Sequence, residues 1–373
     1  MPNNSLRYEF KMPTKLVFGD GCIEELPAFL ESLGSSSQVI ITDNDLLGSN
    51  QIEQVQHLCE DSVTVITAPV GEPTVETVEE TARQLAGASY DTVIGIGGGS
   101  VLDTAKLARL TARHQGADIS LATALESLMS RPPSKLILIP TTAGTGSEVG
   151  PFAVVGKASQ VEKIAVGGDG ITADLAIVDP QMTWSLPPGP TAATGFDALT
   201  HAIEAYCSRA ASPITDDLSL RSMALCSKHL STVTRSPEPI GRAALMEAAT
   251  LAGISFSNAG LGLCHAISGP LGALTHIAHG VANGLVLRAA LEYNRPSLGE
   301  RYQVISSVMG ADPLVTLSKI TEELSFPRSL SEVGISKSDI KNLADLAMNS
   351  KQILNNPRAV TATDIERILE QLL

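Results

Sequence analysis

The sequence is poor in basic and in aromatic residues. Of its 373 residues, 26 are Lys or Arg against 40 Asp or Glu, so the formal net charge is −14, and only 3% are aromatic. An acidic chain does not attract phosphate backbones, and so few aromatic side chains cannot form stacking platforms for bases. We therefore expect no nucleic acid among its partners and no basic patch for membrane surfaces.

Long hydrophobic runs and paired cysteines are also missing. No apolar stretch approaches the roughly 20 residues of a membrane-spanning helix, and the N-terminal residues lack the apolar centre of an export signal. The five cysteines are odd in number, scattered and outside any CxxC pair: Cys22, Cys59, Cys207, Cys226 and Cys264. This pattern argues against a disulfide framework or a zinc ribbon. It predicts reduced thiols, no membrane partner and a cytoplasmic location.

The chain changes character near residue 186. Before it, short apolar runs alternate with helical patterns such as 21–34. Strands are expected at 37–43, 91–98, 135–140 and 174–180. Continuous apolar strands of this kind suit a parallel sheet covered on both faces. After residue 186 only helical patterns follow. We therefore predict a doubly wound α/β domain over 1–185 and an all-helical domain over 186–373, joined at the LPPGP segment.

Two turns rich in glycine and threonine follow predicted strands. The run GIGGGS (95–100) opens a helix, where glycine lets backbone amides approach an anion and the helix N-terminus favours it. The run PTTAGTGSEV (140–149) follows the next strand, at the carboxyl edge where open α/β sheets bind ligands. The first run does not match the GxGxxG fingerprint, so turns without a ligand stay open as the alternative. Together the two runs favour a pyrophosphate site.

Asp43 ends the strand expected at 37–43. An acid at this place can accept hydrogen bonds from both ribose hydroxyls of an adenosine, and it would repel a 2′-phosphate. The alternative is an aspartate that caps the following turn. The first interpretation predicts that NAD is preferred, with NADP possible.

A carboxylate and three histidines have the spacing of a metal site. Asp197 and His201 stand at i and i+4 of a predicted helix and so share one face. His265 and His279 lie fourteen residues apart, which an unbroken helix would separate by about 21 Å. We expect the Gly269-Pro270 pair to break the helix and return His279 to His265. Such a set would hold a divalent first-row ion and leave a position for substrate, whereas a histidine of this kind on its own is more often a capping or surface residue.

Four blocks of the sequence together resemble the iron-containing, or group III, alcohol dehydrogenases. They are GIGGGSVLDTAK (95–106), PTTAGTGSEV (140–149), ATGFDALTHAIEAY (193–206) and HIAHGVANGLVL (276–287). The resemblance runs from about residue 15 to about residue 361, with the blocks in the family's order. It implies a dehydroquinate synthase-like fold, with an α/β nucleotide-binding domain, an all-helical metal-binding domain and the active site between them. It also implies hydride transfer between a nicotinamide cofactor and a small alcohol or aldehyde.

The resemblance assigns residues by motif position. The implied metal ligands are Asp197, His201, His265 and His279, usually around Fe²⁺, although Zn²⁺ or Ni²⁺ would bind such a set at least as tightly. The implied cofactor-binding residues lie in both turns and beyond: Gly97, Gly98, Gly99, Ser100, Asp103, Thr141, Thr142, Thr145 and Lys163. Lys163 falls where the family often has a lysine near the nicotinamide ribose. Homodimers are common in the family, so a homodimer is also implied.

The chain departs from the family pattern near the expected substrate site. Many members carry a further histidine where this chain has Gly269, and a threonine where it has Gly150. We expect His276, three residues before His279, to relay protons in its place, with a water or a packing role as alternatives. The substrate stays open. A polyol (glycerol-type) dehydrogenase and a maleylacetate- or phosphonoacetaldehyde-type reductase are the alternatives on this fold, and a non-catalytic cofactor sensor is the alternative outside enzymes.

Overall fold

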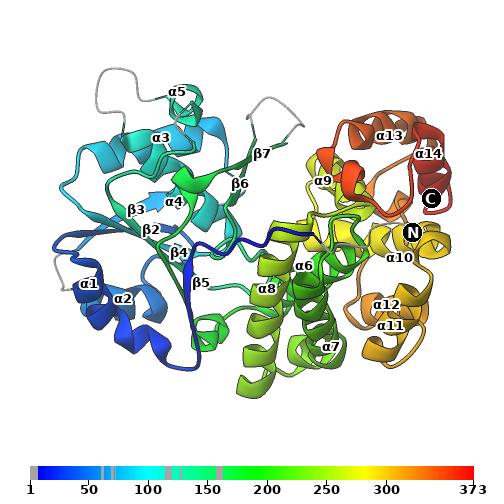
Figure 1. The fold of residues 1–373 in the computed structure, drawn as a ribbon, viewed down its shortest axis with the longest axis horizontal. Helices are drawn as coiled ribbons and strands as arrows, with labels where there is room; N and C mark the ends of the chain where they lie inside the picture. The colour runs from blue at the N-terminus through cyan, green and yellow to red at the C-terminus, as the bar shows by residue number, and fades with distance from the viewer. Residues whose placement is uncertain are drawn as a thin grey trace.

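The structure, a computed structural model, describes residues 7–59, 63–68, 71, 73–113, 120–126, 128–156 and 163–373. Two parts of different architecture lie side by side in Figure 1, a sheet flanked by helices on the left and packed helices on the right. The change occurs between the end of the last strand at Val178 and the start of a long helix at Pro188.

The N-terminal part is built on a six-stranded sheet in the order β1-β8-β5-β4-β2-β3, and every neighbouring pair is parallel. Its strands are β1 (Lys15–Phe18), β2 (Gln38–Asp43), β3 (Thr64–Ala68), β4 (Thr92–Gly97), β5 (Lys135–Pro140) and β8 (Leu175–Val178). Its helices are α1 (Leu26–Leu33), α2 (Asn50–Leu58), α3 (Val75–Ala86), α4 (Gly99–Ala112) and α5 (Leu121–Leu125). Because neighbouring residues of a strand face opposite ways, Ile40 packs with α1 and α2 while Ile41 packs with α3 and α4.

The four predicted strands are confirmed as β2, β4, β5 and β8, and the helix predicted over 21–34 is confirmed as a 3-10 turn followed by α1. Gly34 ends α1 in the left-handed conformation, with φ of 67°. The sequence analysis missed β1 and β3, the two edge strands, which are short and only partly buried. It also missed an antiparallel hairpin, β6 (Phe152–Gly156) with β7 (Lys163–Gly167).

The C-terminal part consists of helices packed around one large apolar core. They are α6 (Pro188–Cys207), α7 (Pro213–Arg235), α8 (Pro239–Ala259), α9 (Leu263–Thr275), α10 (His279–Leu298), α11 (Glu300–Met309), α12 (Pro313–Glu323), α13 (Ile340–Met348) and α14 (Ala362–Glu370). The loss of strands after residue 186 is therefore confirmed. None of the helices in the described ranges is both long and apolar enough to cross a membrane. All five cysteines are free and buried.

The expected break at Gly269-Pro270 is wrong. Helix α9 continues through Pro270 to Thr275, and His276 ends it in the left-handed conformation with φ of 59°. The chain then reverses over 276–278, and α10 begins at His279. A proline removes one helical hydrogen bond but does not by itself stop a helix whose other side is packed, and Ile267 and Leu271 on either side are fully buried.

Candidate metal centre and cofactor edge

Helix α6 delivers two of the predicted ligands. Asp197 and His201 lie one turn apart on its buried side, each 4% exposed. His265 comes from the first turn of α9, and His279 is the first residue of α10. The structure therefore brings together four residues that lie up to 82 positions apart in the sequence.

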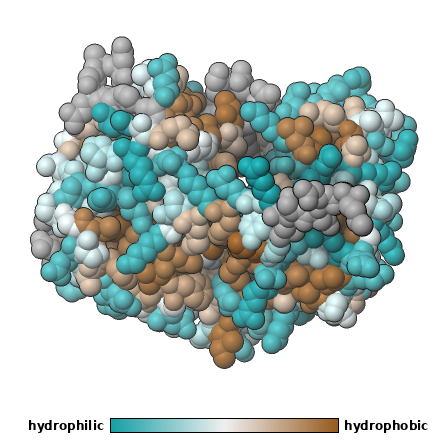
Figure 2. Space-filling view, viewed as in Figure 1, coloured by the Kyte–Doolittle hydropathy of each residue, from teal (hydrophilic) through white to brown (hydrophobic). Residues whose placement is uncertain are grey.

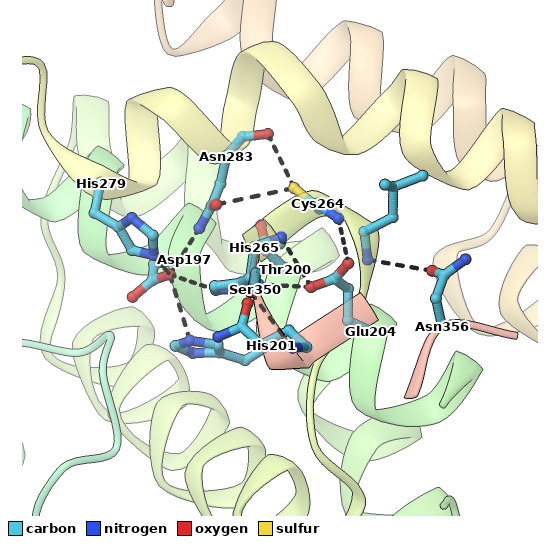
Figure 3. A network of polar contacts seen from close by, with 12 residues as sticks. Asp197, Thr200, His201, Glu204, Cys264, His265, His279, Asn283, Ser350 and Asn356 are labelled. Atoms are coloured by element: carbon cyan, nitrogen blue, oxygen red, sulfur yellow. Dashed lines mark hydrogen bonds and ion pairs between the residues drawn. The ribbon is translucent and has the colours of Figure 1, made fainter. Parts of the chain in front are cut away.

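The three imidazoles converge on one carboxylate oxygen, as Figure 3 shows. The Nε2 atoms of His201 and His265 each lie 3.5 Å from Asp197 Oδ1, and Nε2 of His279 lies 3.7 Å from it. One ligand atom each from Asp197, His265 and His279 lies within 4.8 Å of the others. The rings of His201 and His265 are stacked, with centroids 4.7 Å apart and 12° between the planes.

These separations fit ligand atoms around one ion. Atoms bound at about 2.0–2.2 Å to a tetrahedral ion lie about 3.4 Å from one another. Nε2 of His265 is buried and has no hydrogen-bond partner within the described ranges, a costly state for a polar atom unless an ion occupies the space before it. One carboxylate and three imidazoles are also a donor set suited to divalent first-row metals. The residues present therefore fit the implied metal.

Glu204 holds His265 in place, and the sequence analysis missed it. Its Oε2 lies 2.6 Å from His265 Nδ1, and its Oε1 accepts a hydrogen bond of 2.6 Å from the backbone N–H of Cys264. The contact places the ring proton on Nδ1 and turns Nε2 toward Asp197. The signal was present, because Glu204 stands at i+3 from His201 and i+7 from Asp197 on one face of α6.

Asn283 is a second residue that the sequence analysis missed. Its Nδ2 donates a hydrogen bond of 2.8 Å to Asp197 Oδ1. It stands one helical turn after His279 on α10 and so faces the same way. Gly280 allows this helix to approach α6, because a Cβ built there would lie 1.8 Å from the carbonyl oxygen of Ala193.

Burial and the charges of the cluster act against each other on its pKa values. Burial lowers the pKa of His201 to about 4, although Asp197 opposes this. Burial also disfavours a charged His265, but Asp197 and Glu204 outweigh it and raise its pKa to about 9. For Asp197 burial opposes ionisation, yet the neighbouring imidazoles hold its pKa below the usual range. Asp197 is therefore an anion, and a divalent ion would compete with a proton for His265.

The centre is open on one side. The side chains of Asp197, His201 and His265 are 4–6% exposed, whereas that of His279 is 34% exposed. The ring of Phe256 lies against that of His201, with centroids 4.4 Å apart. A small molecule would therefore approach along His279.

The predicted cofactor residues gather at the carboxyl edge of the sheet. Asp43, Gly97 and Pro140 end the adjacent parallel strands β2, β4 and β5. The chain runs outward from β2 to β3 but places β4 on the other side of β2. Such a reversal of strand order leaves a crevice at the carboxyl ends, where nucleotides bind in open α/β sheets.

The two turns touch one another at this edge. A Cβ built at Gly99 would lie 2.5 Å from Cγ2 of Thr145, and one built at Gly98 would lie 3.5 Å from Cγ2 of Thr142. The N–H of Thr141 donates a 2.9 Å hydrogen bond to the carbonyl of Gly97. Glycine is required here because a side chain at residue 99 would push the second turn away.

The remaining predicted residues occupy different settings. Ser100 lies in the first turn of α4, at the same edge as the glycines. Asp43 uses Oδ1 to accept hydrogen bonds from the N–H groups of Asp45 and Leu46, the capping arrangement considered as its alternative. Asp103 is buried beneath the second turn. Lys163 begins β7, but its side chain lies outside the described part of the structure.

His276 does not share a helical turn with His279. It is the left-handed C-cap of α9, the residue is exposed, and α10 starts three residues later. The helical spacing on which its expected role depended is therefore absent. A role for His276 in proton transfer stays a prediction.

Comparisons with known proteins identify the family of the chain. Residues 13–180 match the family model described as iron-containing alcohol dehydrogenase, and residues 191–373 match that of the Fe-containing alcohol dehydrogenase family, C-terminal. The chain is 37% identical to long-chain-alcohol dehydrogenase 1 of Geobacillus thermodenitrificans, covering 94% of this chain and 93% of that one. It is 32% identical to the NAD-dependent methanol dehydrogenase of Bacillus methanolicus, with 98% and 99% covered.

A solved structure shows the same architecture. Sulfoacetaldehyde reductase from Bifidobacterium kashiwanohense, in complex with NAD+, superposes with a TM-score of 0.91 at 26% identity, over 99% of each chain. The predicted dehydroquinate synthase-like arrangement of a parallel-sheet part and a helical part is thus confirmed. The chain belongs to the iron-containing alcohol dehydrogenase family and is an oxidoreductase that acts on alcohols.

Proposed function

We propose that this alcohol dehydrogenase depends on a divalent metal, with Fe²⁺ as the usual ion, and transfers hydride between NAD(H) and a small alcohol or aldehyde. The observation that carries the proposal is the convergence of three imidazole Nε2 atoms on Asp197 Oδ1, at 3.5–3.7 Å. When bound, the ion would supply Lewis-acid stabilisation of charge on the substrate oxygen, and the nicotinamide would supply the hydride chemistry.

The chain's own residues prepare that chemistry. Asp197, His201, His265 and His279 would hold the ion, and Glu204 keeps the proton of His265 on Nδ1 so that Nε2 presents a lone pair. The buried side of the centre excludes water, and the side near His279 admits the substrate. The glycine turn at the start of α4 would bind the pyrophosphate through backbone N–H groups.

The test is metal loading followed by a substrate panel. Protein freed of metal and reloaded anaerobically with Fe²⁺, Zn²⁺ or Ni²⁺ should bind each ion stoichiometrically by mass spectrometry. It should then reduce small aldehydes with NADH, and glycerol oxidation in the same panel would reveal a polyol dehydrogenase. Activity that is equal with and without bound metal would contradict the proposal.

The preference for NAD has its own test. Asp43 stands beside the glycine turn at the crevice between β2 and β4, where its negative charge would repel a 2′-phosphate. Asp43→Asn keeps the oxygen that caps the turn and removes the charge, so it should raise kcat/KM for NADPH relative to NADH about tenfold. Asp45→Asn, two residues further along, is the control and should leave the ratio unchanged. A wild-type enzyme that prefers NADPH would refute this role of Asp43.

We also propose that the protein is a cytoplasmic homodimer whose cofactor domain spans residues 1–185 and whose metal-binding domain spans 186–373. Figure 2 shows apolar side chains gathered around the lower centre of one face, and such surfaces often mark contacts between proteins. Five free, buried thiols suit a reducing compartment. Sedimentation velocity at micromolar concentration would separate a dimer from a monomer.

A further inference from the structure

Helix α4 carries two fully buried cations one turn apart, Lys106 and Arg109, whose exposed fractions are 0% and 1%. A buried charge is costly unless the protein supplies partners for it. Arg109 donates to the carbonyls of Ser134 and Gly170 and lies 3.6 Å from Asp174, and Ser134 and Asp174 immediately precede strands β5 and β8. Arg109 therefore ties α4 to residues 134, 170 and 174, none of which lies in the second turn.

Lys106 has a different set of partners. Its Nζ donates to Ser147 Oγ at 2.9 Å and to the carbonyls of Gly150 and Phe152 at 3.1 and 2.6 Å. An ammonium group has three protons to donate, so these three bonds use all of them. Each acceptor lies in the segment 147–152, the end of the second turn and the start of β6.

Asp103 completes the arrangement one turn earlier on α4. Its Oδ1 accepts a 2.5 Å hydrogen bond from Ser147 Oγ, and its Oδ2 accepts one of 2.8 Å from the N–H of Val154. It lies 3.8 Å from Lys106 Nζ, so the buried cation has a buried anion beside it. Ser147 is thus held by both charges.

Two of the three acceptors, Ser147 and Gly150, belong to segment 141–150, which contacts both functional regions. Near one end, Thr142 and Thr145 lie against the glycine turn. Between them, Gly144 packs on Thr194 of α6, one turn before Asp197, at a position where a Cβ would be 2.6 Å from the threonine. Gly146 packs equally closely on the backbone of α8. A shift of this segment would therefore move the cofactor edge relative to the metal helix.

We propose that Lys106, with Asp103 and Ser147, is a positioning residue that holds segment 141–150 between the cofactor edge and the metal helix and so sets the distance for hydride transfer. The inference rests on the proposed function, because it assumes that a nicotinamide cofactor binds at the glycine turn. It adds a residue that touches neither cofactor nor metal and acts through the segment that touches both.

The test compares two buried cations on one helix. Lys106→Met and Ser147→Ala are measured against Arg109→Met, which removes an equally buried charge with no partner in segment 141–150. The first readout is hydrogen exchange of peptides over 141–150 in protein without metal or cofactor. The second is NADH affinity of the metal-free protein by fluorescence, and the third is the primary deuterium isotope effect on kcat of the metal-loaded enzyme.

Lys106→Met should speed exchange over 141–150, weaken NADH binding about tenfold and lower kcat on the order of 10²-fold, since a misplacement of about 1 Å has effects of that size. The isotope effect should rise as hydride transfer becomes limiting. Ser147→Ala should do the same about threefold to tenfold, and it decides the question if Lys106→Met does not fold. Arg109→Met should lower stability alone.

Two different failures can be told apart. If Ser147→Ala and Lys106→Met match Arg109→Met in exchange, NADH affinity and isotope effect, Lys106 is a structural residue and the inference is wrong. If the wild-type protein itself binds no NADH, the proposed function fails. Faster exchange in the two variants would then support only the part of the inference that concerns segment 141–150.

Discussion

The two functional regions of this chain are built in opposite ways. The cofactor edge consists of turns with small or hydroxyl side chains, and a Cβ built at Gly99 would lie only 2.5 Å from Thr145. The metal centre consists of ionisable side chains on three helices, most of them buried. The edge works by leaving room for a ligand near the backbone, whereas the centre works by placing charge and lone pairs. We therefore expect an added side-chain atom to impair cofactor binding at the edge, and the loss of a side chain to impair metal binding at the centre.

The largest effect should come from removing a ligand at the metal centre. His265→Ala should abolish stoichiometric metal binding and lower turnover on the order of 10³-fold or more, because the ion would stabilise the charge of the transition state by several kcal/mol. Metal analysis and NADH-linked turnover would be measured together. His229→Ala, on α7, is the control and should change neither. Full metal content with full activity in His265→Ala would refute the assignment.

His276 tests whether an exposed residue three positions before His279 takes part in proton transfer. Asparagine tolerates the left-handed conformation of this C-cap, so His276→Asn removes the imidazole without straining the turn. If His276 relays protons, turnover should fall on the order of 10²-fold with the metal retained, and the pH profile should lose one limb. An unchanged pH profile and turnover would leave His276 with its capping role alone.

Glu204 tests whether the centre depends on the tautomer of a ligand. In Glu204→Gln the amide N–H₂ would donate to His265 Nδ1, so the ring proton would move to Nε2, which faces Asp197. Metal affinity should fall about 10- to 100-fold, the usual effect of losing such a partner, as measured by competition with a chelating dye.

The control for Glu204→Gln is a variant of Asn356. Oδ1 of Asn356 accepts a 3.2 Å hydrogen bond from the N–H of Leu263, the first residue of α9, the helix that carries His265. Asn356→Ala removes that contact with α9 without touching His265, so it should lower stability and leave metal affinity unchanged. Equal metal affinities in the two variants would mean that Glu204 serves only to hold the start of α9.

The smallest effect should come from adding one methyl group at the cofactor edge. In Gly99→Ala the new Cβ would meet Thr145 at 2.5 Å, so the second turn must shift and NADH should bind about tenfold more weakly, with metal content unchanged. Gly189→Ala is the control, because a Cβ there meets no atom within 4 Å. Unchanged NADH affinity, measured by fluorescence titration, would show that the contact between the turns does not shape the site.

Much of the fold could be predicted because its signals are local. The strands that became β2, β4, β5 and β8 are uninterrupted apolar runs, and burial on both faces requires such runs. The edge strands β1 and β3 were not predicted, because a partly exposed strand does not require an uninterrupted apolar run. The break at Gly269-Pro270 was predicted wrongly. Glycine and proline disfavour a helix locally, but burial of the residues around them stabilises α9 more than they weaken it.

In the candidate site too, some residues could be predicted from the sequence and others could not. The four predicted ligands do come together, while Glu204 and Asn283 were missed although each stands at helical spacing from a ligand. Polar residues at that spacing are common on helices, and only a contact separates a partner from a neighbour. Lys106 ends the first of the four family blocks, but lysine is normally exposed and nothing local reveals that this one is buried.

By itself the sequence determined the parallel sheet followed by helices, the glycine and threonine turns, and the four residues with the chemistry of metal ligands. The sheet, the turns and the pairing of Asp197 with His201 depend on residue type and on spacing within one element, and the chain carries that information directly. His265 and His279 stand on two other helices, and residue type and motif position alone marked them as ligands. The tertiary structure alone decided where α9 ends, which carboxylate orients His265, and that a buried lysine ties segment 141–150 to α4. These outcomes depend on which distant surfaces are buried together, because burial changes the cost of a charge, a bend or an unpaired polar atom.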